Sequence, residues 1–435
     1  MDPGVAAPLA AGPSLARAGL MVAPAMAVAN GLNYAFNLVM LRLLEPAAYG
    51  ALGALLAVIL IGTVPGLALQ AVVARHTALR AGDRRAVAEL WSRTLVAVSW
   101  VSLGLGLAVA AAAPALAAFL HLGSIVPALW LAANILPLPL VSALQGMLQG
   151  VQRFGALAAA LLLNAGARLA VGVGLVAAGH GVDGALAASV AGSVLAMLLP
   201  LTLLRPMLAG RGVPSGAPPG GPAVPSGAPR PAPATAALGR EVGAAALAFL
   251  GLLLLTNVDL LLARHYLAAE PSGLYAAGAV VAKIAYWAPQ FVATIVFPRL
   301  ATEAAARRRL LARAAAAITA LGVALMVVVA AAPELAVTLP FGAAYRDVGP
   351  DLPLFAALGT ALALVQLLLF SGIAAGDRKV HRLLGATVVI EVAVIALGPH
   401  HSVTGIVGAA LAAVTALLGA CWVLERRRQP VEAAP

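Results

Sequence analysis

The sequence predicts an all-α polytopic membrane protein with about twelve transmembrane helices in two parallel-repeat six-helix bundles. Of the 435 residues, 62% are hydrophobic and only 10% are charged, against about 25% charged residues in globular proteins. The mean hydropathy of +1.00 means that apolar side chains cannot be confined to one face of each helix. A repeat of short motifs further divides the chain into two similar halves. Together these observations exclude a water-soluble fold.

The membrane-spanning segments follow from the length of the apolar stretches, because a helix needs about 20 apolar residues to cross a bilayer. Several stretches contain proline, such as Pro65, Pro114 and Pro289, which predicts kinks or tilt. Twelve candidates are found, near 19–41, 48–73, 94–120, 125–149, 156–178, 183–204, 242–265, 272–297, 311–333, 351–373, 382–399 and 403–424.

The orientation follows from the 27 Lys and Arg residues, because positively charged loops stay on the cytoplasmic side. With both termini inside, the outer segments hold only Arg42, Arg264 and Arg346, and nearly all other cations fall in inner segments. The net charge of +11 is thus a topology signal and does not indicate binding to nucleic acid. We predict a multi-pass protein of the plasma membrane with both termini cytoplasmic.

The domain boundaries follow from one stretch rich in Pro, Gly and Ser, whose composition cannot pack a core. It predicts a flexible cytoplasmic linker over 206–240. The linker separates an N-terminal six-helix bundle at 1–205 from a C-terminal one at 241–425. A basic cytoplasmic tail at 426–435 follows the second bundle.

The two bundles share motifs at nearly the same spacing. LLEPAAYG follows the first span and LAAEPSGLY follows the seventh, which matches Pro46 to Pro271. QGMLQG in the fourth span matches SGIAAG in the tenth. A half with six spans begins and ends on the same side, so the halves are parallel repeats about an axis along the membrane normal. We therefore expect a substrate path between them.

Two segments carry a family resemblance, namely MLRLLEPAAYGALGALLAVILIGTVPGLALQAVVARHTAL and TNVDLLLARHYLAAEPSGLYAAGAVVAKI. The chain resembles the polysaccharide export or oligosaccharide flippase family of the multidrug/oligosaccharidyl-lipid/polysaccharide (MOP, MATE-like) exporter superfamily, over about 18–424. Its most specific pieces are the Pro-x-x-Tyr-Gly turn at 46–50 and the Asn-x-Asp…Gly-x-Tyr run at 257–275. The chain departs from typical relatives in its longer, proline-rich linker.

The resemblance implies a V-shaped pair of bundles. Separately, no enzymatic activity is expected, because the outer connections are short and lack paired catalytic groups. The resemblance also implies alternating access that flips an undecaprenyl-diphosphate-linked oligosaccharide, a precursor of cell-surface polysaccharide, from the inner to the outer leaflet. The expected partners are this lipid-linked oligosaccharide, membrane lipids, and a polysaccharide polymerase and glycosyltransferases. No cofactor is expected, although coupling to a Na⁺ or H⁺ gradient or to the membrane potential stays open.

Four ionisable residues fall inside the predicted spans, where a charge costs from about 2.5 to above 10 kcal/mol and so faces a cavity or a partner. Arg168 and Lys283 are candidates to bind the diphosphate, with Asn164 on the same helix face as Arg168. Alternatively, Arg168 bonds to a neighbouring span. Asp259 forms either a structural ion pair with Lys283 or an ion site. Glu391, without an obvious cationic partner, is a candidate for ion coupling.

Two further groups are candidates for binding the substrate. Asn30, Asn33 and Asn37 form one polar stripe on the first span, which either binds sugar hydroxyls or bridges helices. Arg42 and Arg264 occupy nearly equivalent places at the outer ends of the first and seventh spans. They either meet the diphosphate on exit or anchor the helices at the headgroups.

Three other functions stay open: a cation-coupled multidrug exporter of the same fold, a membrane-embedded glycan-processing enzyme, and a scaffold for a synthesis complex. The spans hold as many cations as anions, which disfavours binding of cationic drugs. The longest outer connection, about 333–350, offers no nucleophile–base pair, so no catalytic residue is predicted. With one cysteine and seven histidines lacking ligand spacing, no metal site is predicted either.

Overall fold

The structure is a computed structural model that describes residues 13–81, 83–208, 250–289, 307–374 and 379–427. These ranges are helical with short connections, and none of them contains a strand. The predicted linker at 206–240 lies outside the described residues apart from its first three positions, as does the predicted tail at 426–435 apart from its first two.

The first half of the chain forms eight α-helices and one short π-helix. The π-helix, Val176–His180, joins the last two of them and contains Gly179 at a φ of 92°. The helices are α1 (Pro13–Leu43), α2 (Pro46–Gly62), α3 (Val64–Ala78), α4 (Arg84–Phe119), α5 (Val126–Ile135), α6 (Leu138–Gly150), α7 (Phe154–Leu175) and α8 (Gly181–Leu208).

The second half is helical in the same way. A short helical stretch at 250–255 precedes the first of its labelled helices. These are α10 (Val258–Tyr266), α11 (Ala269–Trp287), α13 (Arg307–Ala331), α14 (Pro333–Thr338), the 3₁₀-helix η2 (Ala343–Asp351), α15 (Leu352–Ala374), α16 (Lys379–Leu397) and α17 (Val403–Arg427).

Helix lies in each of the twelve predicted spans, and seven continuous stretches are long and apolar enough to cross a membrane. The prolines act differently from one span to the next. Pro65 breaks the second span at Thr63, because proline has no amide hydrogen to donate within the helix. Helix α11 ends before Pro289. By contrast α4 continues through Pro114.

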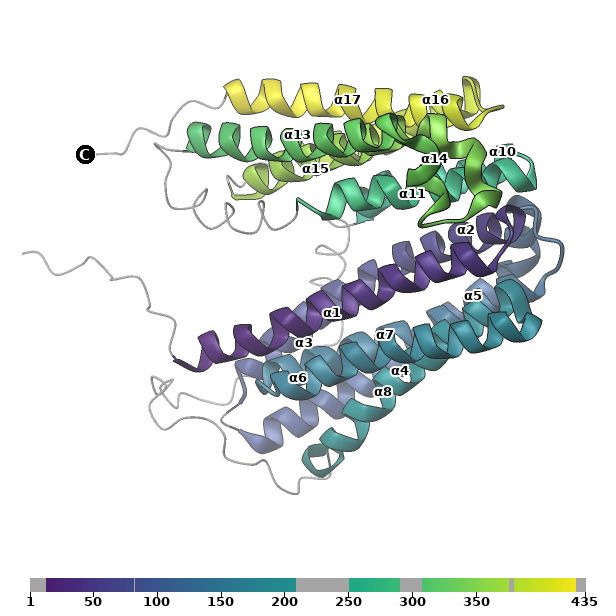
Figure 1. Cartoon of the computed structure of the whole chain (residues 1–435). Coiled ribbons are helices and arrows are strands. Elements are labelled where there is room, and N and C mark those ends of the chain that lie inside the picture. The colour runs from purple at the N-terminus through teal and green to yellow at the C-terminus, as the bar shows by residue number, and fades with distance from the viewer. Residues whose placement is uncertain (1–12, 82, 209–249, 290–306, 375–378, 428–435) are drawn as a thin grey trace, which may run out of the picture.

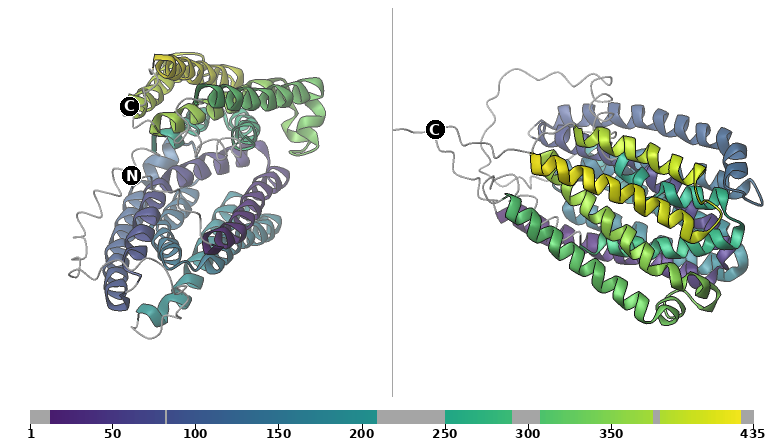
Figure 2. Two further views of the ribbon diagram at one scale, coloured as in Figure 1. Left: turned by 90° about the vertical axis from the view of Figure 1, so that its left-hand side faces the viewer. Right: turned by 90° about the horizontal axis from the view of Figure 1, so that it is seen from above.

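The helices form two groups, α1–α8 and α10–α17, which Figure 1 shows as separate halves of the molecule. The groups approach one another at the end opposite the chain termini and splay apart towards the termini; Figure 2 shows the two groups from the side and from above. Contacts between the halves run mainly through α2, which packs against both α10 and α11. This interface positions the candidate site.

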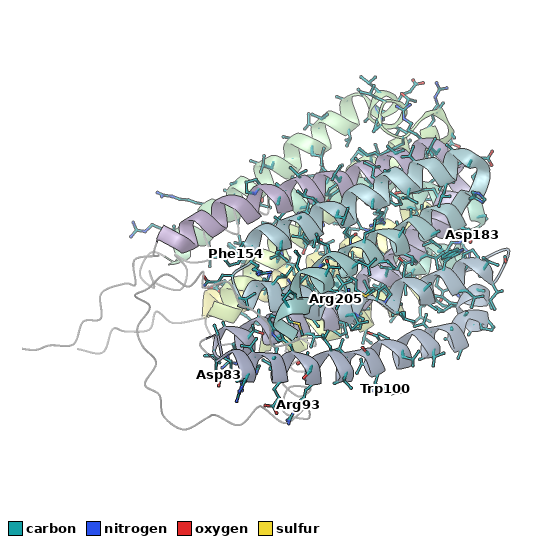
Figure 3. The ribbon with its side chains drawn as sticks, turned by 90° about the horizontal axis from the view of Figure 1, so that it is seen from below. Asp83, Arg93, Trp100, Phe154, Asp183 and Arg205 are labelled. Carbon is teal, nitrogen blue, oxygen red and sulfur yellow. The ribbon has the colours of Figure 1, made fainter. Side chains whose placement is uncertain are left out.

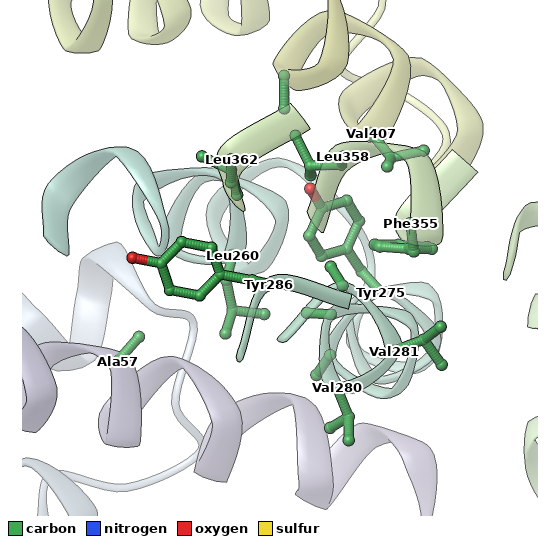
Figure 4. Packing of buried hydrophobic residues seen from close by; sticks show 14 of the residues in the cluster. Ala57, Leu260, Tyr275, Val280, Val281, Tyr286, Phe355, Leu358, Leu362 and Val407 are labelled. Atoms are coloured by element: carbon green, nitrogen blue, oxygen red, sulfur yellow. The ribbon is translucent and has the colours of Figure 1, made fainter. Parts of the chain in front are cut away.

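Small residues bring the backbones of α2 and α11 close together. A Cβ atom at Gly273 would collide with the carbonyl oxygen of Pro46, and one at Gly50 would lie 2.7 Å from Ser272 Oγ. Next to this contact, Tyr275 packs edge-on against Phe355 with ring centroids 5.0 Å apart, as Figure 4 shows. The halves therefore meet backbone to backbone, a mode of packing typical of membrane helices.

Other helices expose their apolar side chains instead. Trp100 on α4 is 70% exposed and points away from the bundle in Figure 3. The charged residues Asp83 and Arg93 lie at the α4 end that faces the chain termini. An apolar exterior between charged ends is the arrangement that lipid contact requires.

Candidate functional site

A cavity of about 50 Å³ lies at the interface of the two helix groups. Tyr34, Asn37 and Tyr49 line it from α1 and α2, and Lys283 lines it from α11 together with apolar residues of α10 and α11. Such a volume holds water, but it is far smaller than an oligosaccharide. A large substrate can therefore enter only if the two groups of helices move apart.

Lys283 also lines a second cavity, of about 20 Å³, inside the C-terminal group. Thr256, Asp259 and Tyr286 line it as well. The hydroxyl of Tyr34 donates to the backbone carbonyl of Lys283 at 3.3 Å, which ties α1 to α11. Lys283 thus stands between the interface and the interior of its own bundle.

Arg168 on α7 contacts α1. Its Nη1 donates to Asn33 Oδ1 at 3.3 Å, and its guanidinium carbon lies 4.1 Å from the centre of the Phe36 ring, a favourable cation–π geometry. Its Nε is buried and has no hydrogen-bond partner among the described residues. The predicted bond to a neighbouring span is therefore present, and the buried Nε still lacks an acceptor.

Arg168 lines neither of the two cavities that hold Lys283. Tyr49, which lines the cavity that holds Lys283, lies within electrostatic range of Arg168. Asn164 and Arg168 both lie next to Gly192 of α8, as residues on one face of α7 should. Tyr49 is a connection that the sequence did not reveal, since it served there only to identify the family turn.

The asparagines of the first span have separate environments. Asn37 lines the interface cavity and donates to the carbonyl of Asn33 at 2.9 Å, while Asn33 donates to that of Ala29 at 3.0 Å. Asn30 is exposed. Only Asn37 therefore reaches the interface cavity in this conformation.

Acidic side chains gather inside the C-terminal group. The Tyr275 hydroxyl donates to Asp259 Oδ2 at 2.7 Å. Glu391 is 0% exposed, and neither of its oxygens has a hydrogen-bond partner in the part of the chain that the structure describes. Glu391 lies on α16, which packs against the helix α10 that carries Asp259, and both Asp259 and Tyr275 are within electrostatic range of Glu391. Two neighbouring buried carboxylates need a proton or a cation to offset their repulsion.

The backbone is interrupted at this acidic cluster. Helix stops at Leu255 and resumes at Val258, and the intervening Asn257 is buried with its Oδ1 lacking a partner among the described side chains. Broken helices supply carbonyl oxygens to ions in membrane transporters. Within the described ranges no ion pair joins Asp259 to Lys283; the two residues line the same 20 Å³ cavity instead.

Arg42 and Arg264 lie outside both cavities. Arg264 is 5% exposed and donates to main-chain oxygens at the end of α4, and Arg42 donates to main-chain oxygens after α14. Both arginines thus cross from one group of helices to the other. Binding of substrate by these two residues stays a prediction.

Comparison with known proteins gives one family match and several matches in fold. A family model described as "Polysaccharide biosynthesis protein" matches residues 39–209. No curated protein sequence matches the chain.

The first two structural matches cover almost the whole chain. An inward-facing multidrug resistance MATE family transporter of the MOP superfamily has a TM-score of 0.69 at 14% identity, covering 91% of this chain and 96% of its own. The lipid II flippase MurJ, in an inward closed conformation, has a TM-score of 0.72 at 12% identity, covering 94% and 87%.

An outward-facing MATE transporter matches less well, with a TM-score of 0.52 at 14% identity and coverage of 94% of each chain. The chain therefore shares its all-helical fold with these transporters, and the match at 39–209 to the polysaccharide biosynthesis family agrees with the resemblance seen in the sequence. The arrangement of the two helix groups is closer to the inward-facing relatives.

Proposed function

We propose that this chain is a membrane flippase that moves an undecaprenyl-diphosphate-linked oligosaccharide from the inner to the outer leaflet of the plasma membrane. In this proposal twelve spans form two six-helix bundles that rock about their common interface. The observation that carries it is the interface cavity, where Lys283 faces Tyr34, Asn37 and Tyr49 of the other bundle. The family match and the fold support the same conclusion.

The cationic residues explain how a diphosphate crosses a region of low dielectric. Charge-assisted hydrogen bonds from an ammonium or a guanidinium replace the water that the phosphates lose. Lys283 makes no hydrogen bond or ion pair through its Nζ within the described ranges, and Arg168 keeps Nε unpartnered. The two groups enter one site when the bundles separate, with Tyr49 between them, while the lipid tail stays in the bilayer.

The acidic cluster supplies the coupling to an ion gradient. A proton or Na⁺ bound between Asp259 and Glu391 removes their mutual repulsion and changes how α10 and α11 pack. Because both helices contact α2 of the other bundle, occupancy of the cluster alters the interface at which the bundles rock. This proposal uses the unpartnered oxygens of Glu391 and Asn257 as ligands.

The flippase proposal is tested by reconstituting the purified chain into liposomes that contain a fluorescent undecaprenyl-diphosphate oligosaccharide. Movement to the outer leaflet is read by quenching with an impermeant reductant. We expect flipping at least tenfold faster than in liposomes with heat-inactivated protein, and slower movement of a monophosphate-linked analogue, because it offers fewer oxygens to the cations.

A second arm of the same experiment examines the multidrug exporter, which the fold match to MATE transporters keeps open. The liposomes receive a fluorescent lipophilic cation in place of the lipid-linked sugar. Gradient-driven transport of this cation, with no flipping of the sugar lipid, would overturn the flippase proposal.

The proposed topology places residue 215 inside and residue 344 outside. Ser272, another outer position, is 1% exposed and accepts a hydrogen bond from Arg264, so Ala344 on exposed η2 is the better reporter. With Cys421 replaced by alanine, an impermeant thiol reagent should label Ala344→Cys in intact cells, and should label Ser215→Cys only after permeabilisation. The reverse pattern would invert the topology.

A further inference from the structure

We propose that Arg42 and Arg264 form a reciprocal pair of latches that hold the outer ends of the two bundles together and set the balance between inward-open and outward-open states. Each arginine belongs to one bundle and binds main-chain carbonyls at the end of a helix in the other. The inference rests on the alternating access of the proposed function.

The Arg264 latch is buried. From the end of α10, Nε donates to the Leu120 carbonyl at 2.8 Å and Nη2 donates to the His121 carbonyl at 3.1 Å. Its Nη1 donates to Ser272 Oγ at 2.8 Å and to the Ala47 carbonyl at 3.5 Å. Three of these four acceptors lie in the N-terminal bundle, so the bonds must break before the outer ends can separate.

The Arg42 latch is the counterpart from the end of α1. Its Nε donates to the Pro340 carbonyl at 3.0 Å, and its Nη2 donates to the carbonyls of Leu339 and Thr338, the latter at 3.3 Å. All three acceptors lie in the C-terminal bundle, directly at and after the end of α14. This side chain is exposed, so water competes for its bonds.

Both helix ends offer carbonyls beyond the last helical hydrogen bonds. After α4, His121 has a φ of 47°, and a residue in this region ends a helix and turns the chain away. After α14 a turn follows, in which the amide of Gly342 donates to the Thr338 carbonyl at 3.2 Å, so Thr338 accepts from Arg42 in addition to this backbone bond. The negative end of the helix dipole also favours a cation there.

The two latches are related by the internal repeat. The two donors are equivalent, because Arg42 lies at the end of the first span and Arg264 at the end of the seventh. The two acceptor regions are equivalent as well, because α4 forms the third span and α13, followed by α14, forms the ninth. Each bundle therefore contributes one donor and one acceptor to the interface. An arrangement that recurs in both directions across a pseudo-symmetric interface is unlike headgroup anchoring, which requires no contact between bundles.

A tyrosine adds a further hydrogen bond between the bundles near these arginines. The Tyr345 hydroxyl on η2 donates to the Leu44 carbonyl at the end of α1, at 2.9 Å. Burial, together with the charge of Glu45, raises the pKa of Tyr345 above its ordinary value, so the hydroxyl keeps its proton at physiological pH. The latch region thus gains a neutral bond that does not depend on pH.

The latches are unequal, which gives the proposal its test. Spin labels placed on Gly123→Cys and Ala344→Cys report the separation of the outer ends, because both positions are exposed and lie in different bundles. Cys421 is replaced by alanine, and distances are measured by pulsed electron resonance in lipid nanodiscs without substrate. Arg264→Gln, Arg264→Lys and Arg42→Gln are compared with this parent.

We expect Arg264→Gln to raise the ratio of long to short distances at least about tenfold, equivalent to about 1.4 kcal/mol. Arg42→Gln should raise it about threefold, because its bonds are exposed. The ratio for Arg264→Lys should lie between those of the parent and of Arg264→Gln, because an ammonium group cannot bond to several acceptors at once as a planar guanidinium does. Arg346→Gln is the matched control, because Arg346 pairs with Glu334 inside its own bundle.

Unchanged distance distributions in Arg264→Gln and Arg42→Gln, in protein that elutes as a single species, would overturn the proposal. The proposal would also be overturned if Arg346→Gln changed the distance distribution as much as Arg264→Gln does. If Arg264→Gln does not fold, Arg264→Lys and Arg42→Gln still decide the question. The measurement uses no substrate, so the latch can fail while the flippase stands, and the flipping assay can fail while the latch stands.

Discussion

Replacing Lys283 by glutamine is expected to slow flipping at least tenfold, and the Arg168→Gln, Lys283→Gln double variant should lose nearly all activity. A charged hydrogen bond contributes about 1.5 to 3 kcal/mol, and about 1.4 kcal/mol is a factor of ten. The Lys283→Gln variant tests the charge alone, because Nζ of Lys283 makes no hydrogen bond in the described ranges that the substitution would break. Membrane insertion should survive, since neutralising an intramembrane charge lowers the insertion cost.

Arg168 carries a structural cost as well as a charge. Its substitution by glutamine also removes the bond to Asn33 and the contact with Phe36, so thermal unfolding must be measured beside activity. Arg168→Lys keeps the charge and should retain part of the activity. The assays are rescue of a flippase-deficient strain at matched protein level and flipping in liposomes, with Arg346→Gln as the control. Full rescue by the double glutamine variant would contradict the assignment.

Glu391→Gln is expected to abolish the stimulation of flipping by an imposed Na⁺ or pH gradient while sparing transport without a gradient. The buried carboxyl has no protein partner in the described ranges, so its charge must be neutralised by a bound cation or proton. Asp259→Asn should have the same effect, and Tyr275→Phe a smaller one, because it removes only the 2.7 Å bond to Asp259.

The stability of the same variants separates an ion site from a structural network. Glu391→Gln should unfold at the same temperature as the parent or higher, since an uncompensated buried charge costs free energy. Glu334→Gln is the control, as its side chain is 74% exposed in the outer loop. Gradient stimulation that persists in Glu391→Gln and Asp259→Asn would remove the acidic cluster from the coupling mechanism.

The helices and the charges inside them follow from the sequence because both are local properties. Apolar length locates a span, and an ionisable residue within it is visible without knowing its neighbours. The break beside Pro65 is equally local. Pro114 shows the limit of that reasoning: proline removes one hydrogen bond, but whether a long helix bends depends on the packing around it.

The partners of these residues do not follow from the sequence. Asp259 accepts a hydrogen bond from Tyr275 and shares only a cavity with Lys283. The acceptors of Arg42 and Arg264 in the opposite bundle are carbonyl groups, which every residue has. Sequence therefore marks the donors and gives no sign of the acceptors. The sequence did not indicate a role for Tyr49, because a neutral aromatic residue in a span carries no unusual free-energy cost of insertion.

The carbonyl acceptors at the two helix ends have a consequence for mutational robustness. Substitutions at Leu120 or Leu339 change a side chain but leave the oxygen that receives the arginine. Side-chain substitutions can therefore accumulate along α4 and α14 without removing the hydrogen bonds that these carbonyls accept from the two arginines. The two arginines are the side chains whose single replacement removes these bonds to carbonyl groups.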